Sequence, residues 1–286
     1  MTDNNKVPVV LTFSGHDPSG GAGVQADIEA IASMGCHGVT VITALTVQDS
    51  VDVKRVQPVD SFLVVEQARA ILEDMQVATV KIGLLGSVEN VEVIHSILHD
   101  YPELPVVLDP VLVSGGGHEL ADTELLEAMR ELLIPSTTVL TPNTLELERL
   151  ASQGDTIDAR AHMLLDRGCE FVLVTGTHVN NPKLVDPVRG VNPVVNVFYG
   201  NGQRLESYTW ERLPYSYHGS GCTLASALAG LLAQGVEPMG AVYEAQHYAW
   251  ETLKHGYAIG MGQHLPNRLF WAEEEDISLW QQDADE

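Results

Sequence analysis

The stretch His218-Gly219-Ser220-Gly221-Cys222-Thr223 stands directly before a run of small and apolar residues that extends to Leu232. This run has helical spacing, so the two glycines lie just ahead of a helix N-terminus. The backbone N–H groups of such a turn converge on one point, and the helix dipole adds partial positive charge there. We therefore expect an anion site at Gly219 to Cys222, with phosphate as the usual anion. The alternative is an ordinary glycine-rich loop with a buried structural cysteine.

Cys222 is one of three cysteines in the chain. It lies in the first turn of the expected helix, where the same field favours a thiolate. Cys36 and Cys169 show no close spacing to it, which excludes a disulfide framework and a zinc motif. The N-terminus is polar and no long apolar run follows. We therefore expect a cytoplasmic protein without a signal peptide or a membrane span.

The composition combines many apolar residues with a strong negative charge. The chain has 286 residues, of which 45% are hydrophobic, enough for a large core. Lys and Arg total 15 against 39 Asp and Glu, a net charge of −24. Such a field disfavours nucleic acid and anionic membranes as partners, so a phosphate site must be built locally. We expect part of the acid excess to lie in a solvated tail over about residues 265–286.

Short apolar strands alternate with helical segments throughout the chain. The expected strands cover residues 8–13, 39–45, 79–85, 105–113, 138–140, 171–174, 194–199 and 203–210. The expected helices cover residues 25–34, 61–75, 87–99, 122–133, 145–151, 157–167, 223–234 and 239–255. The alternation predicts one three-layer α/β domain over residues 1–286, a mostly parallel sheet with helices on both faces.

Glycine-rich and polar loops follow several of these strands. In open sheets of this kind, ligands bind outside the carboxyl ends of the strands. The loops that begin at such ends cover residues 14–23, 46–50, 109–117, 141–146 and 175–178. Their convergence favours the anion site over the ordinary glycine-rich loop. The segment over residues 177–193 is interpreted as either a flap or a surface loop.

Two common phosphate motifs fit the sequence poorly. No glycine is followed by lysine, which excludes a P-loop. Gly21-Ala22-Gly23-Val24-Gln25-Ala26 does fit the dinucleotide fingerprint after a strand. That fingerprint requires an acidic residue about 20 positions further on, and Asp49 is more distant. NAD binding therefore stays as a minor alternative.

A set of motifs follows in order along the chain. The N-terminal motif is Ser14-Gly15-His16-Asp17-Pro18-Ser19-Gly20-Gly21-Ala22-Gly23, followed by Val24-Gln25-Ala26-Asp27. The further motifs are Val41-Ile42-Thr43-Ala44-Leu45 with Gln48, Lys81-Ile82-Gly83, Leu108-Asp109-Pro110-Val111, Thr141-Pro142-Asn143 with Glu146, and His218 to Leu224. In this order they resemble the hydroxymethylpyrimidine/phosphomethylpyrimidine kinase family, and the resemblance covers roughly the first 260 residues. It implies a ribokinase-like fold, ATP and Mg²⁺, a homodimer, and a role in thiamin biosynthesis.

The resemblance also implies the reaction and its catalytic residues. The family phosphorylates the hydroxymethyl group of 4-amino-5-hydroxymethyl-2-methylpyrimidine and then the resulting monophosphate. Gly219, Ser220, Gly221 and Cys222 would hold the transferring phosphoryl group, and in these kinases the cysteine is the candidate base. Alternative functions are a pyridoxal-type kinase on the same fold and a catalytically silent sensor that binds a pyrimidine or a nucleotide.

The remaining candidate residues fall on two sides of the expected site. On the nucleotide and metal side we expect Asp109, Asn143, Glu146, Thr175 and Thr177, with Asn143 and Glu146 orienting Mg²⁺ through water. On the substrate side we expect Gly15, Ala22, Asp27, Gln48, Leu84, Val111 and His218. The Gln48 amide offers a donor and an acceptor that match an aminopyrimidine edge.

The sequence departs from the family pattern at two loops. The family usually carries a lysine where this chain reads Ser114-Gly115-Gly116-Gly117. It also usually reads Lys-Gly-Gly-His where this chain has Thr175-Gly176-Thr177-His178. Both missing lysines are expected near nucleotide phosphates. Their loss puts ATP affinity and the second phosphorylation step in question.

Overall fold

The computed structural model describes residues 6–177 and 193–272. In these ranges the strands form one nine-stranded sheet in the order β3-β2-β1-β4-β5-β6-β7-β8-β9. The strands are β1 (Val9–His16), β2 (His37–Gln48), β3 (Val53–Pro58), β4 (Val77–Ile82), β5 (Val106–Leu108), β6 (Val139–Leu140), β7 (Phe171–Thr177), β8 (Val194–Gly200) and β9 (Gln203–Trp210). All neighbours from β2 to β7 pair in parallel, whereas β3, β8 and β9 pair antiparallel.

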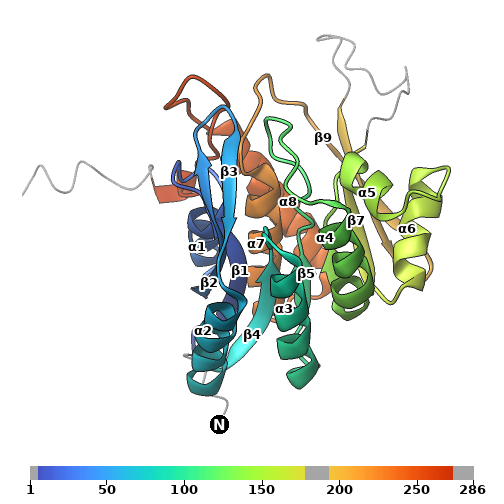
Figure 1. Ribbon diagram of the computed structural model, residues 1–286. Helices are drawn as coiled ribbons and strands as arrows, with labels where there is room; N and C mark the ends of the chain where they lie inside the picture. Colours follow the sequence, from blue (N-terminus) through green and yellow to red (C-terminus); the bar gives the residue numbers. More distant parts are fainter. Residues whose placement is uncertain (1–5, 178–192, 273–286) are drawn as a thin grey trace, which may run out of the picture.

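Helices cover both faces of this sheet (Figure 1). They are α1 (Gly23–Ser33), α2 (Ser61–Asp74), α3 (Val88–Asp100), α4 (Thr123–Ala128), α5 (Thr144–Leu150), α6 (Ile157–Asp166), α7 (Ser220–Ala233) and α8 (Pro238–Lys254). Short helical turns cover Met129–Leu133, Ile134–Ser136 and Phe270–Ala272. Helices α1, α7 and α8 share one core cluster, and α2 to α6 share the other. The predicted three-layer, mostly parallel α/β architecture is confirmed.

The apolar strand residues explain how the two cores form. Successive side chains of a strand point to opposite faces, so a strand covered on both sides must be apolar on both. In β1, Leu11 and Phe13 belong to one core cluster and Val10 belongs to the other, and all three are fully buried. The α7 run of small residues packs against this sheet and against α1 and α8. Its Ala225, Ala227 and Ala229 allow the close approach that burial on two sides requires.

Several element boundaries differ from those expected. The strand expected over residues 105–113 is reduced to Val106–Leu108, because Pro110 has no N–H to donate to a sheet. The polar segment 46–50 is largely strand, since β2 continues to Gln48 and pairs with β3 as an edge hairpin. The helix expected over residues 61–75 is α2, and Asp60 caps it by accepting hydrogen bonds from two backbone amides.

Residues 265–268 do not belong to the solvated tail that was expected to begin at about residue 265. Leu265, Asn267 and Arg268 are all buried. This segment packs against the glycine-rich loops, because its backbone pairs with Tyr257 and its arginine finds several acceptors there. Residues 273–286 of the expected tail and residues 178–192 of the segment interpreted as a flap or a surface loop lie outside the described residues. No helix in the described ranges is long and apolar enough to cross a membrane.

Candidate active site

A cavity of about 540 Å³ opens at the carboxyl ends of the parallel strands. It is lined by the loops after β1, β4, β5, β6 and β7 and by the start of α7. The predicted site residues that line it are Gly15, Ala22, Gln48, Leu84, Asp109, Val111, Asn143, Glu146, Thr175, His218, Gly219, Ser220, Gly221 and Cys222. The cavity lining does not include Asp27. Thr177 ends β7, where its backbone pairs with Val195.

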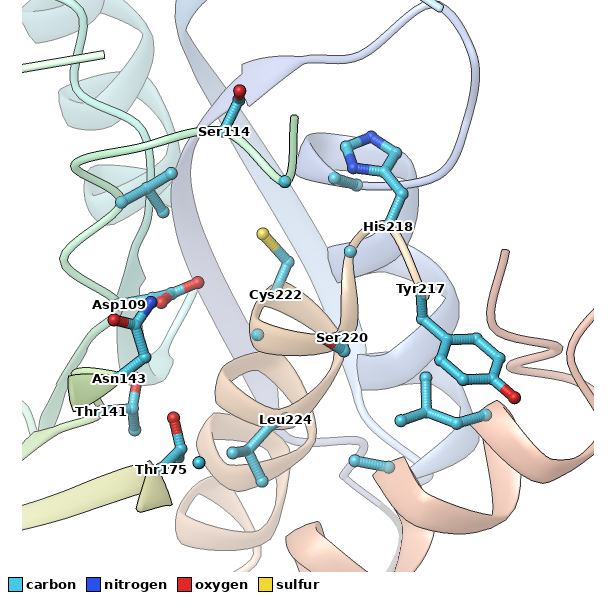
Figure 2. Close-up of a pocket in the computed structure, with 18 of the residues that line it drawn as sticks. Asp109, Ser114, Thr141, Asn143, Thr175, Tyr217, His218, Ser220, Cys222 and Leu224 are labelled. Carbon is cyan, nitrogen blue, oxygen red and sulfur yellow. The ribbon is translucent and has the colours of Figure 1, made fainter. Parts of the chain in front are cut away.

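The start of α7 has the geometry expected of an anion site. Gly219 caps the helix in the left-handed conformation with φ of 85°, which favours glycine. The first hydrogen bond of the helix runs from the Thr223 amide to the Gly219 carbonyl at 3.0 Å. The amides before Thr223 belong to the helix end, where no acceptor within the helix exists. Figure 2 shows Ser220 and Cys222 at this end, facing the cavity.

Cys222 carries a protonated thiol, contrary to the expectation of a favoured thiolate. The pKa of Cys222 is raised to about 12, mainly by burial; Lys81 lowers it, and Asp109 contributes to the rise. The thiol and the Asp109 carboxylate lie close enough that each acts on the pKa of the other. The cost of removing a thiolate from water therefore outweighs the field of the helix N-terminus.

Two carboxylates and an amide gather on the opposite side of the cavity. Figure 2 shows Asp109 beside Asn143. Asp109 is buried, and one of its carboxylate oxygens has no hydrogen-bond partner. Asn143 and Glu146 form a capping box at the start of α5, in which the backbone N–H of Asn143 donates a hydrogen bond to the Glu146 carboxylate at 2.8 Å. Burial raises the pKa of Glu146 to about 8, and the neighbouring Asp109 adds to that shift.

This oxygen-rich cluster is suited to a divalent cation. Carboxylate and amide oxygens are the ligands that Mg²⁺ prefers, often through retained water molecules. A bound cation would take the unpaired Asp109 oxygen as a ligand, and its charge would favour the ionised form of Glu146. The described residues therefore fit the magnesium ion that the family resemblance implies.

Asp27 belongs to a buried ion pair beneath the cavity and does not line it. Its carboxylate lies 2.9 Å from the Lys81 ammonium, and both side chains are fully buried. The remaining contacts of the carboxylate come from the hydroxyls of Ser14 and Ser226. Asp27, which was expected on the substrate side, therefore lies beneath the cavity wall, where its oxygens neutralise and anchor the lysine. Lys81 itself reaches the cavity wall.

Asp17 organises the first glycine-rich loop. Its carboxylate accepts hydrogen bonds from the Ala22 amide and from His218 Nε2, both at 2.8 Å, and from the amide and hydroxyl of Ser19. Burial raises the pKa of Asp17, but the hydrogen bonds from His218, Gln48 and Ser19 outweigh it and hold the pKa below its usual value. The loop after β1 is thus joined to Gln48 and to His218 through one carboxylate.

The other end of the cavity is aromatic. Trp210 and Trp250 line it, with their ring centroids 6.3 Å apart. The Gln246 side-chain oxygen accepts hydrogen bonds from Trp210 at 3.1 Å and from Asn196 at 2.9 Å. Flat apolar faces with a few fixed polar groups are typical of a site for a planar ring system.

Comparison with known proteins decides the family. A family model described as phosphomethylpyrimidine kinase matches residues 17–267. The chain belongs to the phosphomethylpyrimidine kinase family. It is 35% identical to a hydroxymethylpyrimidine/phosphomethylpyrimidine kinase of Synechococcus elongatus over 262 residues, which cover 90% of this chain and 95% of that protein. Membership in this family identifies the chain as a phosphotransferase.

Solved structures of related vitamin kinases have the same fold. The phosphomethylpyrimidine kinase of Clostridium difficile superposes with a TM-score of 0.71 at 30% identity, covering 87% of this chain and all (100%) of that one. The pyridoxal kinase of Bacillus subtilis, solved as an ADP complex, gives a TM-score of 0.82 at 27% identity, covering 93% and 99% of the two chains. The predicted ribokinase-like fold is confirmed.

Several site residues of this family member were not assigned a role from sequence. Asp17 and Lys81 occur inside motifs that carried the resemblance, but no role followed from their spacing. A lone lysine in the apolar strand β4 is the signal that a buried charge needs a partner. The tryptophans at positions 210 and 250 lie on separate elements, β9 and α8, and only the fold brings them together.

The two loops that lack the family lysines also border the cavity. Ser114 donates a hydrogen bond to the Asp52 carboxylate and so joins the 114–117 loop to the segment before β3. Thr175 and Gly176 line the cavity at the end of β7. Among the described lining residues, Lys81 and Arg212 are the lysine and the arginine that remain.

Proposed function

We propose that this protein uses ATP to phosphorylate the hydroxymethyl group of 4-amino-5-hydroxymethyl-2-methylpyrimidine, and then the resulting monophosphate, in thiamin biosynthesis. The observation that carries the proposal is the position of Cys222. It lies at the start of α7, with the Asp109 carboxylate on one side and the loop held by Asp17 on the other. An alcohol held by that loop would meet a phosphoryl group held by the helix.

The pyrimidine is proposed to lie against the substrate loop. Gln48 offers an amide donor and acceptor to the aminopyrimidine edge. Leu84 and Val111 form apolar wall on the same side of the cavity, next to Gly15 and Ala22. Gln48 lies close enough to Asp17 to lower the pKa of that carboxyl, so its side-chain amide lies beside the substrate loop.

The nucleotide is proposed to span from the aromatic end of the cavity to the helix. The base would lie near Trp210 and Trp250, and the γ-phosphoryl group would meet the amides of Gly219 to Cys222. Asp109, Asn143 and Glu146 would hold Mg²⁺, which neutralises phosphate charge during transfer. The backbone and the metal site therefore supply much of the charge stabilisation in a protein that lacks the two family lysines.

In the proposed transfer, the substrate oxygen attacks the γ-phosphorus as the bond to the ADP oxygen breaks. The hydroxyl proton passes to the Cys222 sulfur as the thiol proton passes to an oxygen of the transferring phosphoryl group. This exchange suits a thiol whose pKa is raised, because no free thiolate is required beforehand. The products of the transfer are a phosphate ester and ADP.

A coupled ADP-release assay tests the proposal with three substrates side by side: the pyrimidine alcohol, its monophosphate and pyridoxal. We expect Mg²⁺-dependent turnover with the first two. A pyridoxal-type kinase is the second candidate, because the Bacillus subtilis structure of that name superposes over 93% of this chain. Turnover with pyridoxal alone would favour it. Ligand binding without any turnover would instead indicate a sensor.

We further propose a homodimer in the cytoplasm, as the family resemblance implies. Sedimentation velocity at micromolar concentration tests the oligomeric state. A single species at the mass of one chain would contradict the dimer.

A further inference from the structure

Arg268 is a buried arginine that contacts three separate elements of the site. Its side chain is 2% exposed, and it follows directly after the last residue matched by the family model. Nε donates to the Thr223 hydroxyl at 2.8 Å, and one terminal nitrogen donates to the Gly21 carbonyl. The other terminal nitrogen lies 3.1 Å from the Glu29 carboxylate on α1.

The contact with Thr223 continues to the cap of α7. The Thr223 hydroxyl donates to the Gly219 carbonyl at 2.8 Å, while it accepts from Arg268. That carbonyl belongs to the residue in the left-handed conformation that begins the helix. Arg268 therefore acts through the Thr223 hydroxyl on the carbonyl of Gly219. The orientation of that peptide unit sets the direction of the backbone N–H groups at the anion site.

The contact with Gly21 reaches the substrate loop. The Gly21 carbonyl packs so closely against Gly219 that no side chain fits between them. The same glycine packs against the His218 ring, which in turn hydrogen-bonds to Asp17. The two glycine-rich loops thus meet at one point, and the guanidinium of Arg268 bonds to the first loop directly and to the second through the Thr223 hydroxyl.

The backbone of Arg268 is itself held firmly. Its carbonyl accepts hydrogen bonds from the Tyr248 hydroxyl at 2.8 Å and from the Ser33 hydroxyl at 2.9 Å. These contacts come from α8 and α1, the helices that flank α7 in one core cluster. The main chain of Arg268 is therefore fixed by α8 and α1, and its planar guanidinium group contacts the Gly21 loop and Thr223.

We propose that Arg268 is a positioning residue that sets the distance between the bound alcohol and the phosphoryl group. This inference rests on the proposed kinase function. Phosphoryl transfer depends mainly on alignment, and a displacement of about 1 Å can cost about a hundredfold in rate. A lysine keeps the charge but has no planar fork, so it cannot bond to Thr223, Gly21 and Glu29 together.

The test compares Arg268→Lys with Arg69→Lys, a matched control at an exposed ion pair on α2. We expect Arg268→Lys to lower kcat by about 10- to 100-fold, while the KM values for alcohol and ATP change by less than about threefold. The control keeps wild-type kcat. Hydrogen exchange of the 217–224 segment provides a readout apart from activity, and we expect faster exchange in Arg268→Lys only.

Two further measurements keep the proposal testable if Arg268→Lys folds poorly. Thr223→Val removes the linking hydroxyl and keeps its shape, and we expect it to lower kcat in the same way. In the double variant Arg268→Lys, Thr223→Val the two losses of kcat should not add, because both substitutions break the hydrogen-bonded path from Arg268 through Thr223 to Gly219. Guanidinium ion at millimolar concentration should restore part of the activity of Arg268→Ala.

A folded Arg268→Lys variant with kcat within twofold of wild type would overturn the inference. The inference would also be overturned if the loss of kcat in every variant only followed the fraction of folded protein. Losses of kcat that add in the double variant Arg268→Lys, Thr223→Val would overturn it as well. Failure of the proposed function is a distinct result, since it would appear in the wild-type protein as an absence of turnover. The ratio of variant to wild type can be measured with any alcohol that the wild type phosphorylates.

Discussion

The thiol of Cys222 holds its proton at neutral pH, because burial raises its pKa to about 12. If the sulfur exchanges its proton during transfer, Cys222→Ala should lower turnover by about 10²–10⁴-fold, the usual range for general base catalysis. ATP affinity should be kept, because alanine retains the backbone amide. The measurement is single-turnover kinetics beside ATP titration. More than about a tenth of wild-type turnover would limit Cys222 to the anion site.

Gln48 is the residue that we expect to discriminate the aminopyrimidine. Gln48→Ala should raise the dissociation constant of the pyrimidine by about tenfold or more, because its polar edge loses a partner in the site. ATP affinity should stay nearly unchanged. Isothermal titration with each ligand separates the two effects. Equal losses of both affinities would show that Gln48 acts through Asp17 on the whole loop.

The buried Lys81–Asp27 ion pair should contribute to the stability of the fold as well as to the structure of the site. Lys81→Met leaves a fully buried carboxylate unpaired, which should lower the free energy of unfolding by about 3–5 kcal/mol. The double variant Lys81→Met, Asp27→Asn should lose less, because a neutral amide can still bond to Ser14 and Ser226. Urea unfolding measures both. A loss under about 1 kcal/mol in the single variant would contradict this prediction.

At the scale of one element, α5 combines a helix cap with a candidate metal site. Glu146→Gln keeps an oxygen that can accept from the Asn143 amide, so the capping box and the helix should persist. The lost charge should raise the Mg²⁺ concentration for half-maximal activity by about tenfold. Glu148→Gln, an exposed change on the same helix, is the control. An unchanged Mg²⁺ response in folded Glu146→Gln would leave the residue a helix cap only.

At the scale of the whole molecule, Asp17 joins the N-terminal loop to the start of α7, 201 residues later. Its pKa in the folded state lies below the unfolded value of 3.8. The stability it contributes is therefore present above that value and is lost as the pH falls through the folded pKa. Asp17→Asn should unfold more easily in urea than wild type at pH 6, and this difference should narrow at pH 3. A constant difference would contradict the assigned linkage.

Much of the α/β architecture could be predicted because its signals are local. Apolar strands of the right length alternate with amphipathic helices, and the start of α7 is marked by Gly219 and by the small residues that follow. The helix expected over residues 145–151 is likewise present as α5, which begins directly after Asn143. The strands expected over residues 194–199 and 203–210 form the hairpin of β8 and β9, and Asn201 in its turn adopts a positive φ of 52°.

The remainder depended on contacts between residues far apart in the chain. Nothing local to Asp27 indicates whether its carboxylate faces a ligand or a lysine, because Lys81 lies 54 positions further along the chain. The strand β3 was missed because an edge strand pairs on one side only and its polar residues resemble a loop.

Short segments of the sequence predicted the layer architecture, the family and the loops that line the cavity, because periodicity, turn residues and motif order are local properties. The fold was needed to show which of the candidate side chains reach the cavity, the raised pKa of Cys222, and the burial of Arg268 where a tail was expected. Burial sets those outcomes. The cost of a charge away from water depends on every neighbour that the fold brings to it, and no short segment contains that information.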